Sequence, residues 1–164
     1  MRCTGILKYA VWILYVGIII TCSSCTQKNT LFETISSSYS GIHFNNRIIQ
    51  NDSLNELDVE NIYNGGGAGV GDFNNDGLPD IFLTGNVVPC KLYLNEGNFR
   101  FADITDDAGI NTLGKWCRGV AVIDINNDGR KDIYVSATLK KKAEDRRNLL
   151  YINQGLSSGS IPLF

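Results

Sequence analysis

Two copies of one acidic loop constrain the fold of this chain more than any other feature of its sequence. The first copy is DFNNDGLPD at residues 72–80, which follows the pattern D-x-N-x-D-G-x-x-D. The second copy, DINNDGRKD, occupies residues 124–132 and begins 52 positions after the first. A pattern of this specificity rarely recurs by chance in 164 residues, so it indicates an internal structural repeat.

Each loop presents oxygen atoms at the spacing that a calcium site requires. Calcium takes about six to eight oxygen ligands, and three carboxylates in one loop repel one another unless a cation neutralises them. The predicted Ca²⁺ ligands are Asp72, Asn74, Asp76, the Leu78 carbonyl and Asp80 in the first loop, and Asp124, Asn126, Asp128, the Arg130 carbonyl and Asp132 in the second. The alternative is an Asx-rich turn that needs no metal.

The residues that flank the loops exclude an EF-hand. An EF-hand loop needs a bidentate glutamate at its twelfth position and a helix on each side. That position holds Leu83 in the first copy and Val135 in the second, and the flanking segments are rich in strand-forming residues. The loops are therefore predicted to connect β-strands.

Strand-forming segments follow the same order around both loops. In the first unit they lie at 81–84, 91–94 and 99–104, after a glycine-rich run at 65–71; in the second they lie at 116–123, 133–136 and 149–152, with a charged, solvated loop predicted at 140–147. A period near 50 residues with about four strands per unit is typical of a propeller or a related β array. The predicted fold class is all-β, with β-propeller-type blades.

Two segments carry a resemblance to a known family. Residues 67–81 and 119–133 resemble FG-GAP (VCBS-type) repeats, the calcium-loop blades of integrin α-subunit propellers and of many exported bacterial proteins. The run LYLNEG at 92–97, with the following residues 99–110, further resembles the bacterial lipoproteins that are similar to cartilage acidic protein. The resemblance implies that calcium stabilises each blade and that ligands bind to the surface of a closed propeller.

The resemblance also sets the expected domain organisation. We expect a first repeat with its N-terminal leader at 41–111 and a second, truncated repeat at 112–164. Propellers close with roughly four to eight blades, so two repeats form an incomplete propeller with open sheet edges. The expected explanation is an N-terminal fragment of a longer protein, and assembly with another chain is the alternative.

The N-terminus is typical of an exported lipoprotein. Arg2 and Lys8 precede an uncharged apolar run at 9–20, which predicts a signal peptide over 1–24; a signal anchor is the alternative.

The run CSSC at 22–25 resembles a bacterial lipobox, with Cys25 as the acylated residue; modification of Cys22, plain cleavage and a disulfide between the two cysteines remain open. The Ser-rich stretch 25–40 is predicted to be a flexible tether. Membrane attachment through lipid at the cell envelope, as an outer-membrane lipoprotein, follows from this interpretation.

Composition and motifs exclude several other functions. The net charge of −2 leaves no basic surface for nucleic acid. The chain has one histidine, His43, and no G-x-S-x-G motif, and the glycine run lacks the Gly-Lys-Ser/Thr ending of a phosphate loop. We therefore predict a protein that is not an enzyme. Cys90 and Cys117 are free to pair in an exported protein, but their pairing cannot be read from sequence.

The sequence as a whole favours an exported, lipid-anchored, calcium-binding module for adhesion or ligand binding at the cell surface, with an unknown protein or glycan as its partner. The expected calcium affinity is that of extracellular modules, on the order of 10⁻⁴–10⁻³ M. The alternatives are a non-catalytic accessory region of a longer exported enzyme and a truncated fragment without a function of its own.

Overall fold

A computed structural model describes residues 30–57, 59, 61–157 and 159–164. The chain divides into two compact units, Met1–Thr34 and Ile35–Phe164, and all the strands lie in the second. The predicted signal peptide at 1–24 and the predicted acylation of Cys25 lie outside the described residues. Within the described ranges, no helix is long and apolar enough to cross a membrane.

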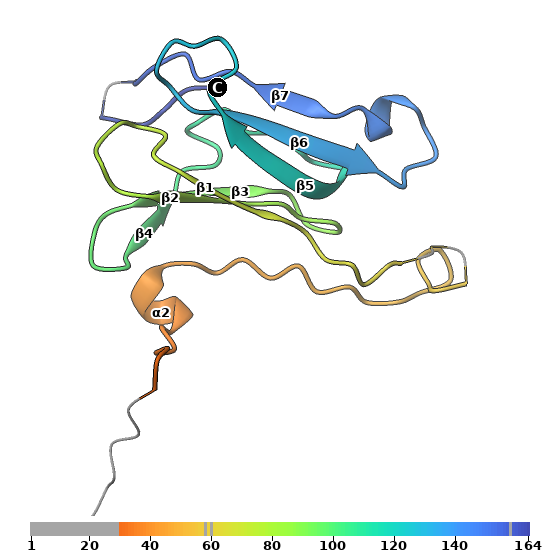
Figure 1. The fold of residues 1–164 in the computed structure, drawn as a ribbon. Helices are drawn as coiled ribbons and strands as arrows, with labels where there is room; N and C mark the ends of the chain where they lie inside the picture. Colours follow the sequence, from red (N-terminus) through yellow and green to blue (C-terminus); the bar gives the residue numbers. More distant parts are fainter. Residues whose placement is uncertain (1–29, 58, 60, 158) are drawn as a thin grey trace, which may run out of the picture. The chain divides into compact units, whose positions relative to one another are not determined.

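The second unit is built from two antiparallel sheets (Figure 1). The first sheet has the strand order β1-β2-β3-β4 and the second the order β5-β6-β7. The strands are β1 (Ala68–Gly71), β2 (Asp80–Leu83), β3 (Lys91–Asn95), β4 (Phe101–Asp103), β5 (Trp116–Ile123), β6 (Asp132–Thr138) and β7 (Leu149–Tyr151). Every strand predicted after the first loop is present, and each sheet is a meander in which consecutive strands pair. Both sheets are propeller-type blades, as the repeat pattern predicts.

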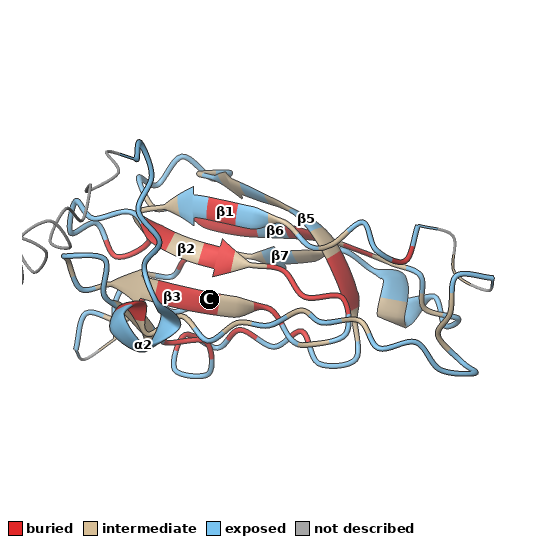
Figure 2. Cartoon of the chain, turned by 90° about the horizontal axis from the view of Figure 1, so that it is seen from below, coloured by how far each residue is buried: buried red, intermediate tan, exposed pale blue. Residues whose placement is uncertain are grey.

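The two sheets stack face to face, and the hydrophobic core lies between them (Figures 1 and 2). Phe82 and Leu92 point into this core from the first sheet, and Ile133 and Val135 point into it from the second; all four are fully buried. Burial of each such side chain contributes about 1.5–3 kcal/mol. Buried and half-buried residues alternate along β2, and half-buried and exposed residues alternate along β5 from Arg118 onward, as the two-residue period of a strand predicts.

The glycine-rich run before the first loop is a packing surface. A Cβ atom added to Gly69 would lie 2.8 Å from a methyl group of Val122, and one added to Gly71 would lie 2.7 Å from another methyl of the same valine. A Cβ atom added to Gly67 would lie 2.8 Å from the Arg118 carbonyl oxygen. β1 therefore carries glycine because β5 packs directly against its backbone.

Two short helices were not predicted. The segment expected to be a tether contains a helical turn, α2 (Ser37–Ser40), which is capped by the Ser36 hydroxyl and ended by Gly41 in the left-handed conformation. A Cβ atom at Gly41 would also collide with the Phe101 carbonyl oxygen, so the turn lies against β4. The charged loop at 140–147 contains one 3-10 turn, η1 (Glu144–Arg146). Single turns of this kind carry too weak a pattern to be read from sequence.

Candidate metal-binding loops

The two acidic loops occupy equivalent places and follow the same backbone path. The first loop (residues 72–80) connects β1 to β2, and the second (residues 124–132) connects β5 to β6. Each has an asparagine at position 4 with φ near 60° and a glycine at position 6 with φ near 85°. Glycine and asparagine tolerate this left-handed region better than other residues. The repeated N-x-G spacing in the two loops is therefore a requirement of the turn itself.

The side chains at positions 1, 3 and 5 turn inward onto the backbone of their own loop. In the first loop, the two carboxylate oxygens of Asp72 accept hydrogen bonds from the N–H groups of Asp76 (3.1 Å) and Gly77 (2.8 Å). The Asn74 side-chain oxygen accepts a second bond from the Asp76 N–H (3.2 Å). The second loop repeats all three bonds at 3.0, 2.9 and 3.1 Å. The predicted ligands at these positions thus gather around the loop's centre.

The aspartate at position 9 ties each loop to the rest of its sheet. The Asp80 side chain is fully buried, and its two oxygens accept bonds from the N–H groups of Phe73 (2.8 Å) and Asn95 (2.8 Å). Asp132 makes the equivalent bonds to Ile125 (2.9 Å) and Asn153 (2.8 Å). Each position-9 carboxylate therefore joins the start of its loop to the turn that follows the third strand of the sheet.

The charges of the first loop act on one another. Burial raises the pKa of Asp80 above its ordinary value, and the nearby carboxylates of Asp76 and Asp72 raise it further, against the opposing effect of the two backbone hydrogen bonds. A divalent cation among these carboxylates would relieve this repulsion. The donors are all oxygen atoms, which is the chemistry that calcium prefers.

The residues therefore fit a hard cation by chemistry. Among the residues that the structure describes, however, no three Asp, Glu, His or Cys side chains are grouped closely enough to hold a metal. The ten ligand assignments remain a prediction. In the present arrangement the position-9 and position-1 carboxylates accept hydrogen bonds from backbone N–H groups elsewhere in the loop and sheet, whereas the side chains at positions 3 and 5 form Asx turns with the residue two positions on.

Asn95 and Asn153 are members of the site that sequence reasoning did not assign to it. The Asn95 amide donates to the Pro79 carbonyl (2.8 Å), and its side-chain oxygen accepts from Gly97 N–H (2.8 Å). The Asn153 amide donates to the Phe73 carbonyl in the first loop (2.8 Å). The recurrence of N-x-G after the third strand of both sheets was a visible signal of this role.

The two loops differ at position 7. Leu78 stands there in the first loop, whereas the second has Arg130, whose guanidinium forms an ion pair with Asp128 (2.8 Å) and donates to the Asn153 carbonyl (3.0 Å). The Arg130 backbone N–H is the largest cause, and its guanidinium a further one, of the pKa of Asp128 lying below its ordinary value. The second loop thus carries an internal cation that the first lacks.

Comparison with known proteins places these loops in a family. The family model described as "FG-GAP-like repeat" matches residues 47–135. Cartilage acidic protein 1 of Xenopus tropicalis is 36% identical over a match that covers 48% of this chain and 12% of that protein. Integrin alpha-8 of Gallus gallus is 33% identical over 59% of this chain and 10% of its own length. The chain thus spans about a tenth of the length of these relatives. Because the family model matches more than half of the residues and includes both loops, the chain belongs to the FG-GAP-like repeat family.

Proposed function

We propose that this chain is a calcium-stabilised binding module without catalytic activity. What supports the proposal is that both loops bring the same four oxygen-bearing side chains onto the same backbone path. In each, a buried aspartate joins the loop to its sheet. Ca²⁺ held by these residues would neutralise the carboxylates at positions 1, 5 and 9, which now accept hydrogen bonds from backbone N–H groups. The loops then hold the ends of the sheets in a fixed shape.

The proposed target is a protein or a glycan at the cell surface. The match to the FG-GAP-like repeat model and the similarity to integrin alpha-8 support a role in adhesion or ligand binding. We further propose that the protein is exported and held at the cell envelope, as an outer-membrane lipoprotein, through acyl chains on Cys25. Labelling of the full chain with palmitate in a bacterial host tests this part: Cys25→Ala should abolish the label, whereas Cys22→Ala should keep it.

Thermal unfolding of the full chain with calcium and with excess chelator tests the central proposal. A ligand at free concentration c that binds only the folded state stabilises it by RT ln(1 + c/Kd), which for a Kd of 10⁻⁴–10⁻³ M and roughly 10 mM calcium is about 1.4–2.7 kcal/mol. We expect a cooperative transition that moves upward with millimolar calcium and returns when chelator is added. A cooperative transition that ignores calcium would contradict the metal assignment.

A matched pair of variants locates the effect. Asp72→Asn with Asp76→Asn removes two carboxylates from the first loop. Asp106→Asn with Asp107→Asn removes two exposed carboxylates outside both loops and so changes the net charge equally. Only the first pair should reduce the calcium-dependent shift. An equal reduction in both would indicate general screening of an acidic protein.

A further inference from the structure

Two fully buried cysteines meet where the two sheets join. Cys90 precedes β3 in the first sheet and Cys117 lies in β5 of the second; both thiols are free. Their exposed fractions are 1% and 0%, and both belong to the one hydrophobic core. They are 27 positions apart in sequence, so a bond between them would join the two sheets covalently.

Backbone contacts hold the two segments that carry these cysteines against each other. The Cys117 N–H donates to the Gly85 carbonyl (3.0 Å), and the Asn86 amide donates to the Cys117 carbonyl (2.8 Å). The Cys90 N–H donates to the Thr112 hydroxyl (2.7 Å). Segments 85–90 and 112–117 are therefore tied together near both of their ends.

Each of the two thiols is the main influence on the pKa of the other. The neighbouring Cys117 thiol lowers the pKa of Cys90, while the Cys90 thiol and burial raise the pKa of Cys117. The Cys90 sulfur is therefore the one that carries thiolate character. Because a thiolate is the attacking species in thiol–disulfide exchange, the pair has a defined nucleophile and a defined resolving thiol.

We propose that Cys90 and Cys117 form a disulfide that joins the first sheet to the second when the protein meets a disulfide oxidant, either a small molecule or a protein. The Cys90 thiolate attacks one sulfur of the oxidant, the oxidant's S–S bond breaks, and one oxidant thiol leaves. The Cys117 sulfur gives up its proton to solvent, attacks the Cys90 sulfur and releases the second oxidant thiol. Two protein thiols are oxidised and one disulfide is reduced to two thiols.

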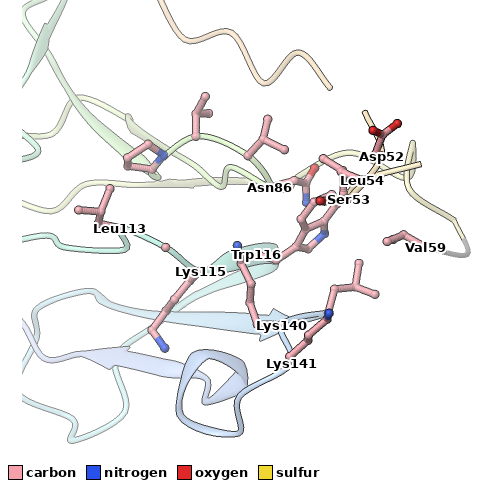
Figure 3. A pocket seen from close by; sticks show the side chains of 15 residues that line it. Asp52, Ser53, Leu54, Val59, Asn86, Leu113, Lys115, Trp116, Lys140 and Lys141 are labelled. Atoms are coloured by element: carbon pink, nitrogen blue, oxygen red, sulfur yellow. The ribbon is translucent and has the colours of Figure 1, made fainter. Parts of the chain in front are cut away.

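One pocket is lined by the segments that lead to the two cysteines (Figure 3). Its volume is about 850 Å³. The residues that line it include 86–89, which directly precede Cys90, and 113–116, which directly precede Cys117. An oxidant in this pocket would therefore lie beside both of these segments.

The test uses the full chain with Cys3, Cys22 and Cys25 replaced by serine, so that the core pair holds the only thiols. The folded protein is incubated with oxidised glutathione, alkylated, digested without reductant and examined by mass spectrometry. We expect a cross-linked peptide pair containing Cys90 and Cys117 and no remaining alkylated thiol. Two alkylated cysteines, or glutathione adducts alone, would overturn the proposal.

A second measurement uses the chain without the serine replacements at Cys3, Cys22 and Cys25. The oxidised protein should melt several degrees higher than the same sample after dithiothreitol, because a cross-link restricts the unfolded chain. Cys117→Ala and Cys117→Ser should both lose this reductant-dependent shift, whatever their own stability. A shift that persists in either variant, or an oxidised wild-type chain that melts no higher than the reduced one, would contradict a bond between the sheets.

Discussion

The two repeats carry the same motif, but they meet different surroundings. The face of β1 that bears Gly67, Gly69 and Gly71 is covered by β5, whereas the equivalent face of β5, with Gly119, Ala121 and Ile123, is exposed. The same contrast holds inside the loops: Phe73 at position 2 is 1% exposed, and Ile125 at that position is 53% exposed. In the first repeat this face of the motif packs against another sheet, whereas in the second repeat the equivalent face is exposed.

This contrast separates what the motif does for its own loop from what it does for the neighbouring repeat. The left-handed turn residues and the position-9 aspartate recur in both loops, so they serve the loop locally. The size of the residue at position 2, and of the small residues in the preceding strand, is restricted only where another sheet packs against them. Position 7 differs for a third reason, because Arg130 supplies the second loop with a positive charge.

The largest expected difference concerns position 2. Phe73→Ala should lower the free energy of unfolding by about 3–5 kcal/mol, the usual cost of emptying a buried phenylalanine site. The ring packs edge-on against Phe164, with 6.0 Å between the ring centres. Ile125→Ala should cost less than about 0.5 kcal/mol because that side chain is half in solvent. Chemical denaturation of the two variants measures this difference, and similar losses would mean that Ile125 is covered in solution.

The next effect concerns the feature that the two repeats share. Asp80→Ala and Asp132→Ala each leave two backbone N–H groups without an acceptor, one buried and one partly buried in each case. Both variants should therefore lose on the order of 3 kcal/mol, and by similar amounts. Urea unfolding in the presence of chelator measures this loss without a metal contribution. A large inequality between the two would break the equivalence of the loops.

A smaller effect is expected in the strands before the loops. Gly69→Ala places a methyl group 2.8 Å from Val122, and such overpacking costs about 1–3 kcal/mol. Its repeat partner is already an alanine, Ala121, on an exposed face. Ala121→Gly should therefore cost only the backbone entropy of glycine, about 0.5–1 kcal/mol. Thermal melts of both variants compare the two strands, and a tolerated Gly69→Ala would contradict the close approach of the sheets.

Local patterns in the sequence were sufficient to predict the strands, the loops and the repeat. Alternation, turn residues and a nine-residue motif are all properties of neighbouring positions, and they placed β2, β3, β5, β6 and β7 within a residue or two. The contacts that distinguish the repeats join distant positions. Asn153 is 80 positions from Phe73, and nothing near either residue indicates that its amide reaches that carbonyl. Long-range pairs of this kind follow from the stacking of the sheets.

Position 7 shows the same limit. The motif predicts the same role for Leu78 and Arg130, a backbone carbonyl ligand, because the side chain at that position is not part of the motif. The guanidinium donates to the Asp128 carboxylate and, through Nε, to the Asn153 carbonyl, so it links the loop to the segment after β7. A charged residue inside an acidic loop was visible in the sequence. The contact of the Arg130 side chain with the Asn153 carbonyl joins residues more than twenty positions apart, and the sequence does not indicate it.

The smallest expected effect follows from this difference in charge. Arg130 already neutralises part of the second loop, so calcium entering there would lose one attractive carboxylate interaction and meet a like charge. Arg130→Leu should strengthen calcium binding at the second loop severalfold, and Leu78→Arg should weaken it at the first by a similar factor. Terbium luminescence or calorimetric titration measures both changes, each in a background where the other loop carries Asp→Asn at positions 1 and 5. Arg130→Lys is the matched control, because it retains the charge but loses the forked geometry that bridges two acceptors. If removal of the arginine left the affinity unchanged, the guanidinium would be a structural link to the turn after β7, and the two loops would be equivalent calcium sites despite their different charges.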